Sequence, residues 1–252
     1  MQYKDEIEAW LSIAEKAALL AGSYLLNPEQ QSKNINSDAG RDIKIAADVE
    51  SENIILNFLK ENSGFSILSE ESGMIQRNDR RFTWIIDPLD GSLNYLRGIP
   101  FCCVSIGLWH EQSPILGVVN DFHHSELYTG IAGKGAWING VKIGISSVNE
   151  KKRALLCTGF PINTDFSTES LLSFIQKVQG YKKVRILGSA ALSLVYIASG
   201  RADAYMEDDI MLWDVAGGIA IASGSGCKCE INAGSHPNAF RVTVSNGNFD
   251  VN

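Results

Sequence analysis

Basic residues are scarce in this chain of 252 residues. Its 22 Lys and Arg residues are outnumbered by 29 Asp and Glu residues, which gives a formal net charge of -7 at pH 7. An acidic total disfavours nucleic acids and anionic membranes as partners, because their phosphate groups repel it. The sequence therefore predicts neither a nucleic-acid-binding nor a membrane-bound protein.

Long apolar runs are also missing. The longest ones, "ILGVVNDF" and "VAGGIAIASG", fall short of the roughly 20 residues that cross a bilayer as a helix. The first residues carry acids within an amphipathic pattern, whereas a secretory leader has a basic segment, an apolar core and a cleavage site. We therefore expect a cytoplasmic location.

Cysteine is sparse and unpatterned. The five cysteines are an odd number without the spacing of a disulfide framework, which indicates reduced thiols. Cys227 and Cys229 in "GCKCE" could ligate a soft metal, but no second Cys pair or His cluster completes such a site. We expect buried cysteines on strands.

The length of the chain and the order of its predicted helices and strands are typical of a layered fold. Apolar residues make up 45% of the sequence, and its length suits one large domain or two small subdomains. Helical spacing predicts helices over 4–26 and 49–61, and "WINGVKI" predicts a hairpin at Asn139-Gly140. Short β-rich runs fill the middle, and helices alternate with strands from residue 167. This order predicts an α+β fold with approximate subdomains 1–145 and 146–252.

The stretch "WIIDPLDGS" carries the first chemical signal. The apolar run predicts a buried strand with Asp87 at its end, and we expect Pro88 to end regular pairing there. Asp87, Asp90 and the carbonyl of Leu89 can converge on hard cations, which prefer oxygen ligands. Gly91 permits a close backbone approach, and a helix starting at Ser92 would favour a phosphate at its N-terminus. The alternative is a solvated turn.

Two further segments place acids at the ends of apolar runs. "ILSEESG" reads as a strand ending in Glu70 and Glu71, of which only one should face the site, because adjacent side chains on a strand point in opposite directions. "MLWDVAGG" supplies Asp214 at the start of a small-residue helix, where helix capping is the simpler explanation. Three such segments together favour a shared metal site.

With these motifs the chain resembles the inositol monophosphatase family of Mg2+-dependent, lithium-sensitive phosphatases. The resemblance runs through "SEES", "WIIDPLDGSLNY" and "LWDVAGG", and extends to "GSAALSLVYIASGRADAYMED" and "GKGAWINGVKI". It implies a layered α/β/α/β sandwich of the sugar phosphatase type. It also implies hydrolysis of a small phosphate ester by metal-activated water, in a protein that is often a homodimer.

The resemblance assigns roles by position. A first Mg2+ would be held by Glu70, Asp87 and the Leu89 carbonyl, and a second by Asp87, Asp90 and Asp214. Ser92 and Glu70 would orient the attacking water, and Asp48 would support the site or bind a third ion. The remaining roles concern the substrate. The N-H groups of Gly91 and Ser92 would bind its phosphate. Its alcohol part would contact Glu207, Gly188, Ser189 and Ala190.

Two departures from the family pattern bear on the site. In "DIKIAAD", Ile45 and Ala47 stand where relatives carry hydroxyl residues, and Lys44 adds a cation. A third metal is therefore in doubt, unless Lys44 points to solvent. The run Glu207–Asp209 is more acidic than a polyol pocket requires; it either repels highly phosphorylated substrates or is in part a solvated turn.

The expected function is hydrolysis of a polyol or sugar phosphate, foremost myo-inositol 1-phosphate. Fructose 1,6-bisphosphatase, 3'-phosphoadenosine 5'-phosphate nucleotidase and histidinol phosphatase activities are alternatives within the same fold. A regulatory binding protein that retains the fold is a non-enzymatic alternative, although all the metal carboxylates are present.

Overall fold

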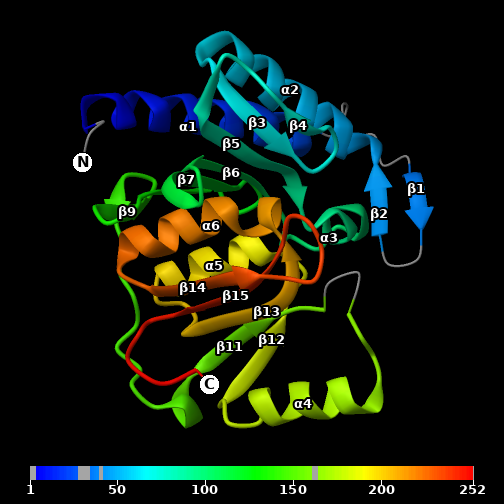
Figure 1. Ribbon diagram of the computed structural model, residues 1–252, viewed down its shortest axis with the longest axis vertical. Coiled ribbons are helices and arrows are strands. Elements are labelled where there is room, and N and C mark those ends of the chain that lie inside the picture. Colours follow the sequence, from blue (N-terminus) through cyan, green and yellow to red (C-terminus); the bar gives the residue numbers. More distant parts are fainter. Residues whose placement is uncertain (1–3, 28–34, 40–41, 161–163, 252) are drawn as a thin grey trace.

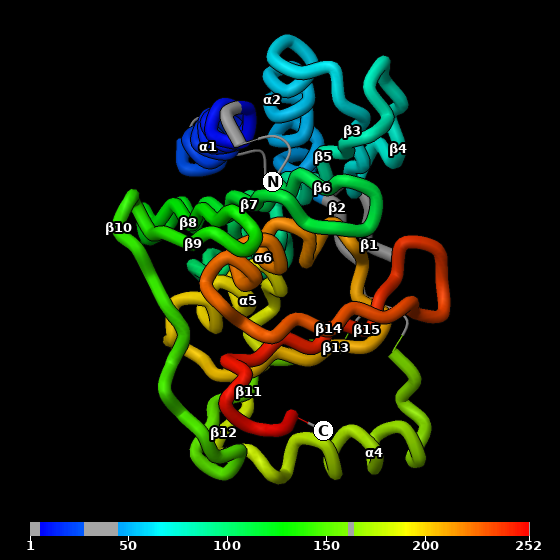
Figure 2. The backbone as a smooth tube through the Cα atoms, turned by 60° about the vertical axis from the view of Figure 1, so that its left-hand side comes forward, coloured from blue at the N-terminus to red at the C-terminus, as the bar shows by residue number. Residues whose placement is uncertain are grey.

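The computed structural model describes residues 4–27, 35–39, 42–160 and 164–251. Helices and sheets alternate in layers, as Figures 1 and 2 show from two directions. The order is a helix pair, an eight-stranded sheet, a second helix pair, a five-stranded sheet and a single outer helix. The predicted α+β layered sandwich is thus confirmed, with one helix layer more than expected.

The first layer consists of α1 (Lys4–Leu26) and α2 (Ala46–Asn62). Both helices occur where the apolar spacing predicts them, although α2 begins three residues earlier than expected. A two-stranded antiparallel sheet of β1 (Ile35–Ala39) and β2 (Asp42–Ile45) leads directly into α2. The stretch before this helix is therefore partly strand.

The eight-stranded sheet has the order β10-β9-β8-β7-β6-β5-β3-β4. All neighbours are antiparallel except β3 and β5. The predicted Asn139-Gly140 turn joins β9 to β10, with φ of 49° and 78° at its two residues. The strands are β3 (Phe65–Ser69), β4 (Gly73–Ile75), β5 (Asp79–Asp90), β6 (Cys103–His110), β7 (Ser113–Asp121), β8 (Glu126–Ile131), β9 (Gly135–Ile138) and β10 (Val141–Lys142).

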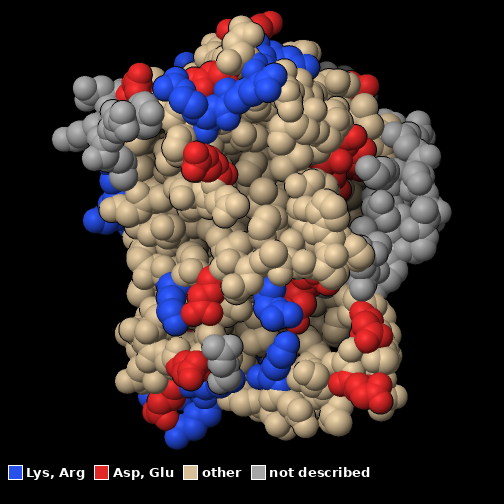
Figure 3. Space-filling model, viewed as in Figure 1, with Lys and Arg blue, Asp and Glu red and all other residues tan. Residues whose placement is uncertain are grey.

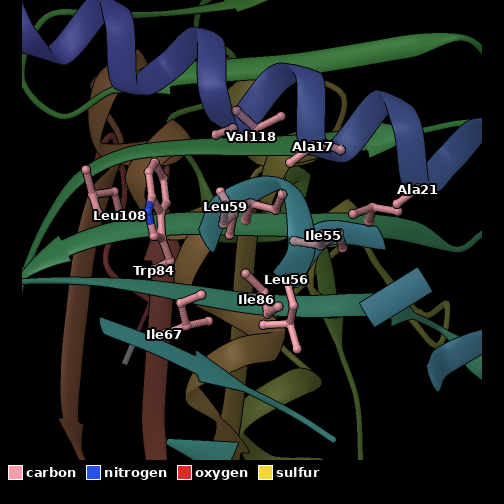
Figure 4. Close-up of a cluster of buried hydrophobic side chains, with 14 of the residues drawn as sticks. Ala17, Ala21, Ile55, Leu56, Leu59, Ile67, Trp84, Ile86, Leu108 and Val118 are labelled. Carbon is pink, nitrogen blue, oxygen red and sulfur yellow. The ribbon is translucent and has the colours of Figure 1, made fainter. Parts of the chain in front are cut away.

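One face of this sheet packs against α1 and α2. Figure 4 shows Trp84, Ile86, Leu108 and Val118 of the sheet meeting small residues of α1, such as Ala17, and aliphatic side chains of α2. Burial of these apolar side chains from water is the main favourable contribution to folding. It also fixes α2 over the end of β5, where the predicted acids lie.

The opposite face of the sheet packs against α5 (Ala190–Ala198) and α6 (Leu212–Ser225). Helix α6 lies very close to the strands, because glycines face one another: a Cβ on Gly117 would lie 2.1 Å from the Gly217 carbonyl oxygen. Both helices are covered by the second sheet on their other side, so they are apolar almost all round. This packing holds the first turn of α6 beside the end of β5.

The five-stranded sheet has the order β12-β11-β13-β15-β14. Its strands are β11 (Leu155–Thr158), β12 (Lys183–Ile186), β13 (Ala204–Met211), β14 (Lys228–Ala233) and β15 (Ala239–Ser245), with β11 parallel to β12 and β13. Helix α4 (Thr168–Val178) covers its outer face, and the short η1 (Lys151–Arg153) precedes β11. The proposed division at residues 145 and 146 stays a prediction.

Two expectations from composition can be compared with the structure. Within the described ranges, no helix is both long and apolar enough to cross a bilayer. All five cysteines are free thiols; Cys102, Cys103 and Cys157 are buried, whereas Cys227 and Cys229 are half-buried. Cys102 lies just before β6 and Cys227 just before β14, so only three of the five are on strands.

Candidate functional site

The turn at the end of β5 differs from its prediction. The strand runs through Pro88 to Asp90, and its pairing with β6 is interrupted between Asp87 and Asp90. The expectation that regular pairing ends at Pro88 is therefore confirmed, whereas the expectation that the strand itself ends at Asp87 was wrong. Because Pro lacks an N-H, it is tolerated at such an irregularity. The irregularity leaves Asp87 and Asp90 both buried, and the Leu89 N-H donates to Asp87 Oδ1 at 3.0 Å.

Gly91 makes the tight exit from this strand possible. Its φ is 91°, in the left-handed region that favours glycine, and a Cβ would lie 2.9 Å from the Phe101 carbonyl oxygen. Helix α3 (Ser92–Arg97) starts at the next residue, which meets the condition set for a phosphate site there. The backbone at Gly91 also approaches Gly188, whose carbonyl oxygen would lie 3.1 Å from that Cβ.

Asp90 is held by the start of α5. Its Oδ2 accepts hydrogen bonds from the Ser189 hydroxyl at 2.5 Å and the Ala191 N-H at 2.7 Å, and the Cys103 thiol lies 3.9 Å away. Burial raises the pKa of Asp90 to about 6, against these hydrogen bonds, which lower it. Sequence reasoning assigned Ser189 to the substrate pocket and missed its bond to Asp90 and the presence of Cys103.

Four acids from three separate parts of the chain act on one another. Burial raises the pKa of Asp87 well above its ordinary value, and the negative charges of Glu70, Asp90 and Asp214 raise it further. The pKa of Asp214 is raised in the same way by burial, then by Glu70 and Asp90. Buried carboxylates that repel one another favour either protons or cations between them. The predicted acid cluster is thus assembled in the structure.

The local positions of two of these acids differ from simple expectation. Glu70 lies in the turn after β3, which ends at Ser69, so strand alternation does not decide between Glu70 and Glu71. Asp214 lies within the first turn of α6, where the N-cap is Met211. The backbone N-H of Met211 hydrogen-bonds to the Asp214 carboxylate and lowers its pKa, so Asp214 helps close the helix end without being its cap.

Asp48 and Ser92 form a pair beside the cluster. The Ser92 hydroxyl lies 2.9 Å from Asp48 Oδ1 and 3.0 Å from the Leu89 carbonyl oxygen. The other Asp48 oxygen accepts the Ile45 N-H at 2.7 Å, which closes the N-terminus of α2. Ile45 and Ala47 are buried. The side chain of Lys44 lies outside the described residues, so the expectation about it stays a prediction.

Glu207 extends the acid cluster onto β13. Burial raises its pKa to about 7, although the Tyr205 hydroxyl, which donates to it at 2.8 Å, lowers it. The alternative that Asp208 and Asp209 form a solvated turn was wrong about the turn, since both lie in β13, although in the stretch where its pairing with β15 is irregular and where Asp208 is exposed. Asp208 pairs with Lys177 and Arg241, and Asp209 accepts hydrogen bonds from Ser235.

A cavity of about 720 Å³ adjoins Glu207 between α4 and the outer face of the five-stranded sheet. Its walls combine apolar side chains, such as Phe174 and Met206, with the Lys177–Asp208–Arg241 ion pairs. In the lower half of the face drawn in Figure 3, basic and acidic side chains are mixed. Because the cavity is large and Glu207 lines it, it offers room for groups attached to a ligand that reaches Glu207.

The donor set of the cluster suits a hard divalent cation. It consists of carboxylates and the Leu89 carbonyl, and oxygen ligands of this kind are preferred by Mg2+ and Ca2+. Among the described residues, however, no three His, Cys, Asp or Glu side chains are already arranged as a closed set of metal ligands. The donor chemistry therefore suits a hard cation, although the described side chains are not arranged as a ready ligand set.

Comparisons with known proteins identify the family of the chain. The model of the inositol monophosphatase family matches residues 6–250. Inositol monophosphatase 3 of Solanum lycopersicum is 37% identical over 90% of this chain and 87% of its own length. Nus factor SuhB of Pasteurella multocida is 31% identical over 89% of this chain and 86% of its own.

A solved structure shows the same likeness in three dimensions. Inositol monophosphatase from Anabaena superposes with a TM-score of 0.83 at 34% identity, covering 96% of this chain and 92% of that one. Phosphatases of this family are generally metal-dependent and act on small phosphorylated substrates. Because the family match spans nearly the whole chain and the acids are assembled, this protein belongs to the inositol monophosphatase family and is a phosphoric monoester hydrolase.

Proposed function

We propose that this protein hydrolyses the phosphate monoester of a small polyol or sugar, with myo-inositol 1-phosphate as its foremost substrate. The observation that carries the proposal is the gathering of Glu70, Asp87, Asp90 and Asp214: burial raises the pKa of each of the three aspartates, and repulsion within the cluster raises the pKa of Asp87 and Asp214 further. Such a cluster is costly for a folded protein unless cations occupy it. Metal-dependent hydrolysis accounts for its presence.

Two Mg2+ ions are proposed as cofactors, with a third optional. Glu70, Asp87 and the Leu89 carbonyl would hold the first ion, and Asp87, Asp90 and Asp214 the second. Bound divalent ions supply a water of lowered pKa and neutralise the developing charge on the phosphate and the leaving oxygen. Lithium inhibition is expected from the family.

The chain's own residues would orient the reactants. The Ser92 hydroxyl donates either to Asp48 or to the Leu89 carbonyl, so its oxygen remains able to accept a hydrogen from the attacking water. Glu70, after β3, would receive the other proton of that water. The N-H groups of Gly91 and Ser92 would bind the phosphate, with Asp90 beside them.

The alcohol part of the substrate would lie along α5 and β13. Glu207 is proposed to accept hydrogen bonds from ring hydroxyls, with Gly188, Ser189, Ala190 and Asp214 completing that side. The Ser189 hydroxyl also donates to Asp90, so Ser189 orients a proposed metal ligand in addition to lining the substrate pocket. Groups larger than a ring could extend into the cavity beside Glu207.

Alternative functions stay open at the level of substrate. Fructose 1,6-bisphosphate, 3'-phosphoadenosine 5'-phosphate and histidinol phosphate are the alternative substrates. A regulatory role is the non-enzymatic alternative, since some relatives carry the name Nus factor. Retention of all four metal carboxylates favours the enzyme. The homodimeric state and the cytoplasmic location are also proposals.

The deciding experiment measures phosphate release from those four substrates, with Mg2+ and with a chelator. The proposal predicts chelator-sensitive release, fastest from myo-inositol 1-phosphate. Preference for one of the other three would correct the substrate but keep the chemistry. Absence of release from all four, in a folded protein that binds Mg2+, would favour the regulatory role.

A further inference from the structure

Helix α2 buries three polar side chains along one face of its first two turns. Asp48, Ser51 and Glu52 are each at most 3% exposed, and their spacing of three and four residues places them side by side. The following turns present only apolar residues to the core, namely Ile55, Leu56 and Leu59. Burying polar groups is unfavourable unless they are hydrogen-bonded. The hydrogen-bond partners of these three side chains therefore show which segments this face of α2 holds in place.

Each of the three side chains reaches a different part of the acid site. Asp48 contacts Ser92, as described above. The Ser51 hydroxyl donates to the Pro88 carbonyl oxygen at 2.7 Å. Pro88 lies where β5 loses its regular pairing with β6, between Asp87 and Leu89. Ser51 therefore fixes the backbone that presents two of the proposed ligands.

Glu52 holds the turn that carries Glu70. Its Oε1 accepts hydrogen bonds from the Ser69 hydroxyl and, at 3.0 Å, from the Ser72 N-H. Its Oε2 accepts the Ser72 hydroxyl at 2.6 Å. These serines flank Glu70 and Glu71, so one buried carboxylate binds both ends of the two-residue segment.

We propose that Glu52 is a positioning residue for metal binding, which acts through Ser69 and Ser72 to hold Glu70 against Asp87, while Ser51 holds the Pro88 backbone. The inference rests on the proposed metal-dependent function. Its physical basis is that Mg2+ tolerates little deviation in ligand geometry. A small shift of the turn, by a fraction of an ångström, should therefore lower the affinity of the site for Mg2+, even when the Glu70 side chain itself is unchanged. A single rigid helix that holds both segments fixes the distance between them.

Two variants weaken the hydrogen bonds between Glu52 and the turn, one by changing the acceptor and the other by removing a donor. Glu52→Gln keeps the volume of the side chain but replaces one of the two acceptor oxygens with a donor, while Ser72→Ala removes one hydroxyl donor from the turn. Asn53→Ala, at the exposed neighbouring position on α2, is the matched control. Thermal unfolding in the presence of chelator reports whether each variant folds; should Glu52→Gln fail to fold, Ser72→Ala decides.

Metal binding is measured directly by titration calorimetry with Mg2+ and by electron paramagnetic resonance with Mn2+, both without substrate. We expect affinity to fall on the order of 10-fold or more in both variants, as is common when a group supporting a ligand is lost, and to be unchanged in Asn53→Ala. In turnover, the Mg2+ concentration for half-maximal rate should rise by a similar factor, with kcat largely restored at saturating Mg2+.

Two outcomes would contradict the proposal in different ways. If a folded variant binds Mg2+ and Mn2+ as the wild type does, Glu52 has only a structural role and the inference is wrong. If the wild type itself binds neither ion, the proposed function is wrong, and the inference falls with it. The wild-type titration thus separates the two failures.

Discussion

The Ser189 hydroxyl connects the N-terminus of α5 to the buried Asp90 carboxylate. Its oxygen donates to Asp90 Oδ2 at 2.5 Å and accepts the Leu192 N-H at 3.2 Å, so one side chain both caps the helix and orients the acid. The Ala191 N-H adds a second bond to the same oxygen. The position of Asp90 is thereby tied to the layer of helices between the two sheets.

Replacing Ser189 with alanine should therefore affect stability and activity together. Loss of the cap is expected to lower the free energy of unfolding by about 1 kcal/mol. Loss of the bond to Asp90 should reduce phosphate release by roughly 10-fold. Ser189→Thr, which keeps the hydroxyl, is the control. Denaturant unfolding and steady-state kinetics check both effects; wild-type turnover in Ser189→Ala would show that the remaining partners of Asp90 orient it without the hydroxyl.

Asp90→Asn should abolish turnover without unfolding the protein. The change removes a proposed metal ligand, and we expect phosphate release to fall at least about 100-fold. In the metal-free state it also removes a buried charge that repels Asp87 and Asp214, so the melting temperature in chelator should stay the same or rise.

The matched control for Asp90→Asn is Asp79→Asn, at the opposite end of β5. Asp79 pairs with the exposed Arg81 at 2.7 Å, and such surface pairs contribute little to stability. Activity in Asp79→Asn should equal that of the wild type. Near-normal hydrolysis by the Asp90 variant would refute the assigned metal site.

The sequence predicted helices and turns well where the spacing of apolar residues or a short turn motif determines them. The α1 periodicity gave the observed bounds, and Asn139-Gly140 adopts the two positive φ angles that its hairpin turn requires. The acids of the site were found because each follows an apolar run that the sheet or helix layers bury. These features depend on residues near one another in the chain.

Contacts between distant segments could not be predicted in this way. Ser189 and Asp90 are 99 residues apart, and Glu52 and Ser72 are 20 apart, so no periodicity connects them. A partial signal existed in α2, because Asp48 and Glu52 are four residues apart and thus share a face. The continuation of β5 through Pro88 was missed because it depends on an irregular pairing with β6.

The metal-free protein should lose stability as the pH rises from about 5 to about 8. In the folded state, the pKa of Asp90 is about 6 and that of Glu207 about 7, against ordinary values of 3.8 and 4.5. The folded protein thus binds more protons than the unfolded chain across this window. By linkage, the free energy of unfolding falls with rising pH until these groups have ionised in both states.

This pH dependence is measured by denaturant unfolding in chelator at several pH values. Acids with lowered pKa, such as Asp79 and Asp209, affect stability only at lower pH. Burial lowers the pKa of His123, which acts in the opposite direction within this range but is one group against two acids. Adding Mg2+ at about pH 8 should restore stability, because ligand binding to the folded state stabilises it. Constant stability across the range would mean that the acids are solvated, contrary to their burial.

Glu207→Gln distinguishes a role in substrate recognition from a role in the metal site. The glutamine carbonyl can still accept the Tyr205 hydroxyl, so the fold should persist. A polyol phosphate should lose one charge-assisted hydrogen bond, worth about 1.5 kcal/mol, which corresponds to a KM increase of roughly 10-fold. p-Nitrophenyl phosphate has no hydroxyl on its alcohol part, so its KM should barely change.

Glu230→Gln, on β14, is the control, since Glu230 forms an exposed pair with Lys228 at 2.7 Å. Steady-state kinetics with both substrates decide between the roles. Glu207 also raises the pKa of Asp214 by its charge, so removing that charge could act on metal binding. In that case kcat and the Mg2+ requirement would change equally for both substrates, and the assignment of Glu207 to the alcohol part would be wrong.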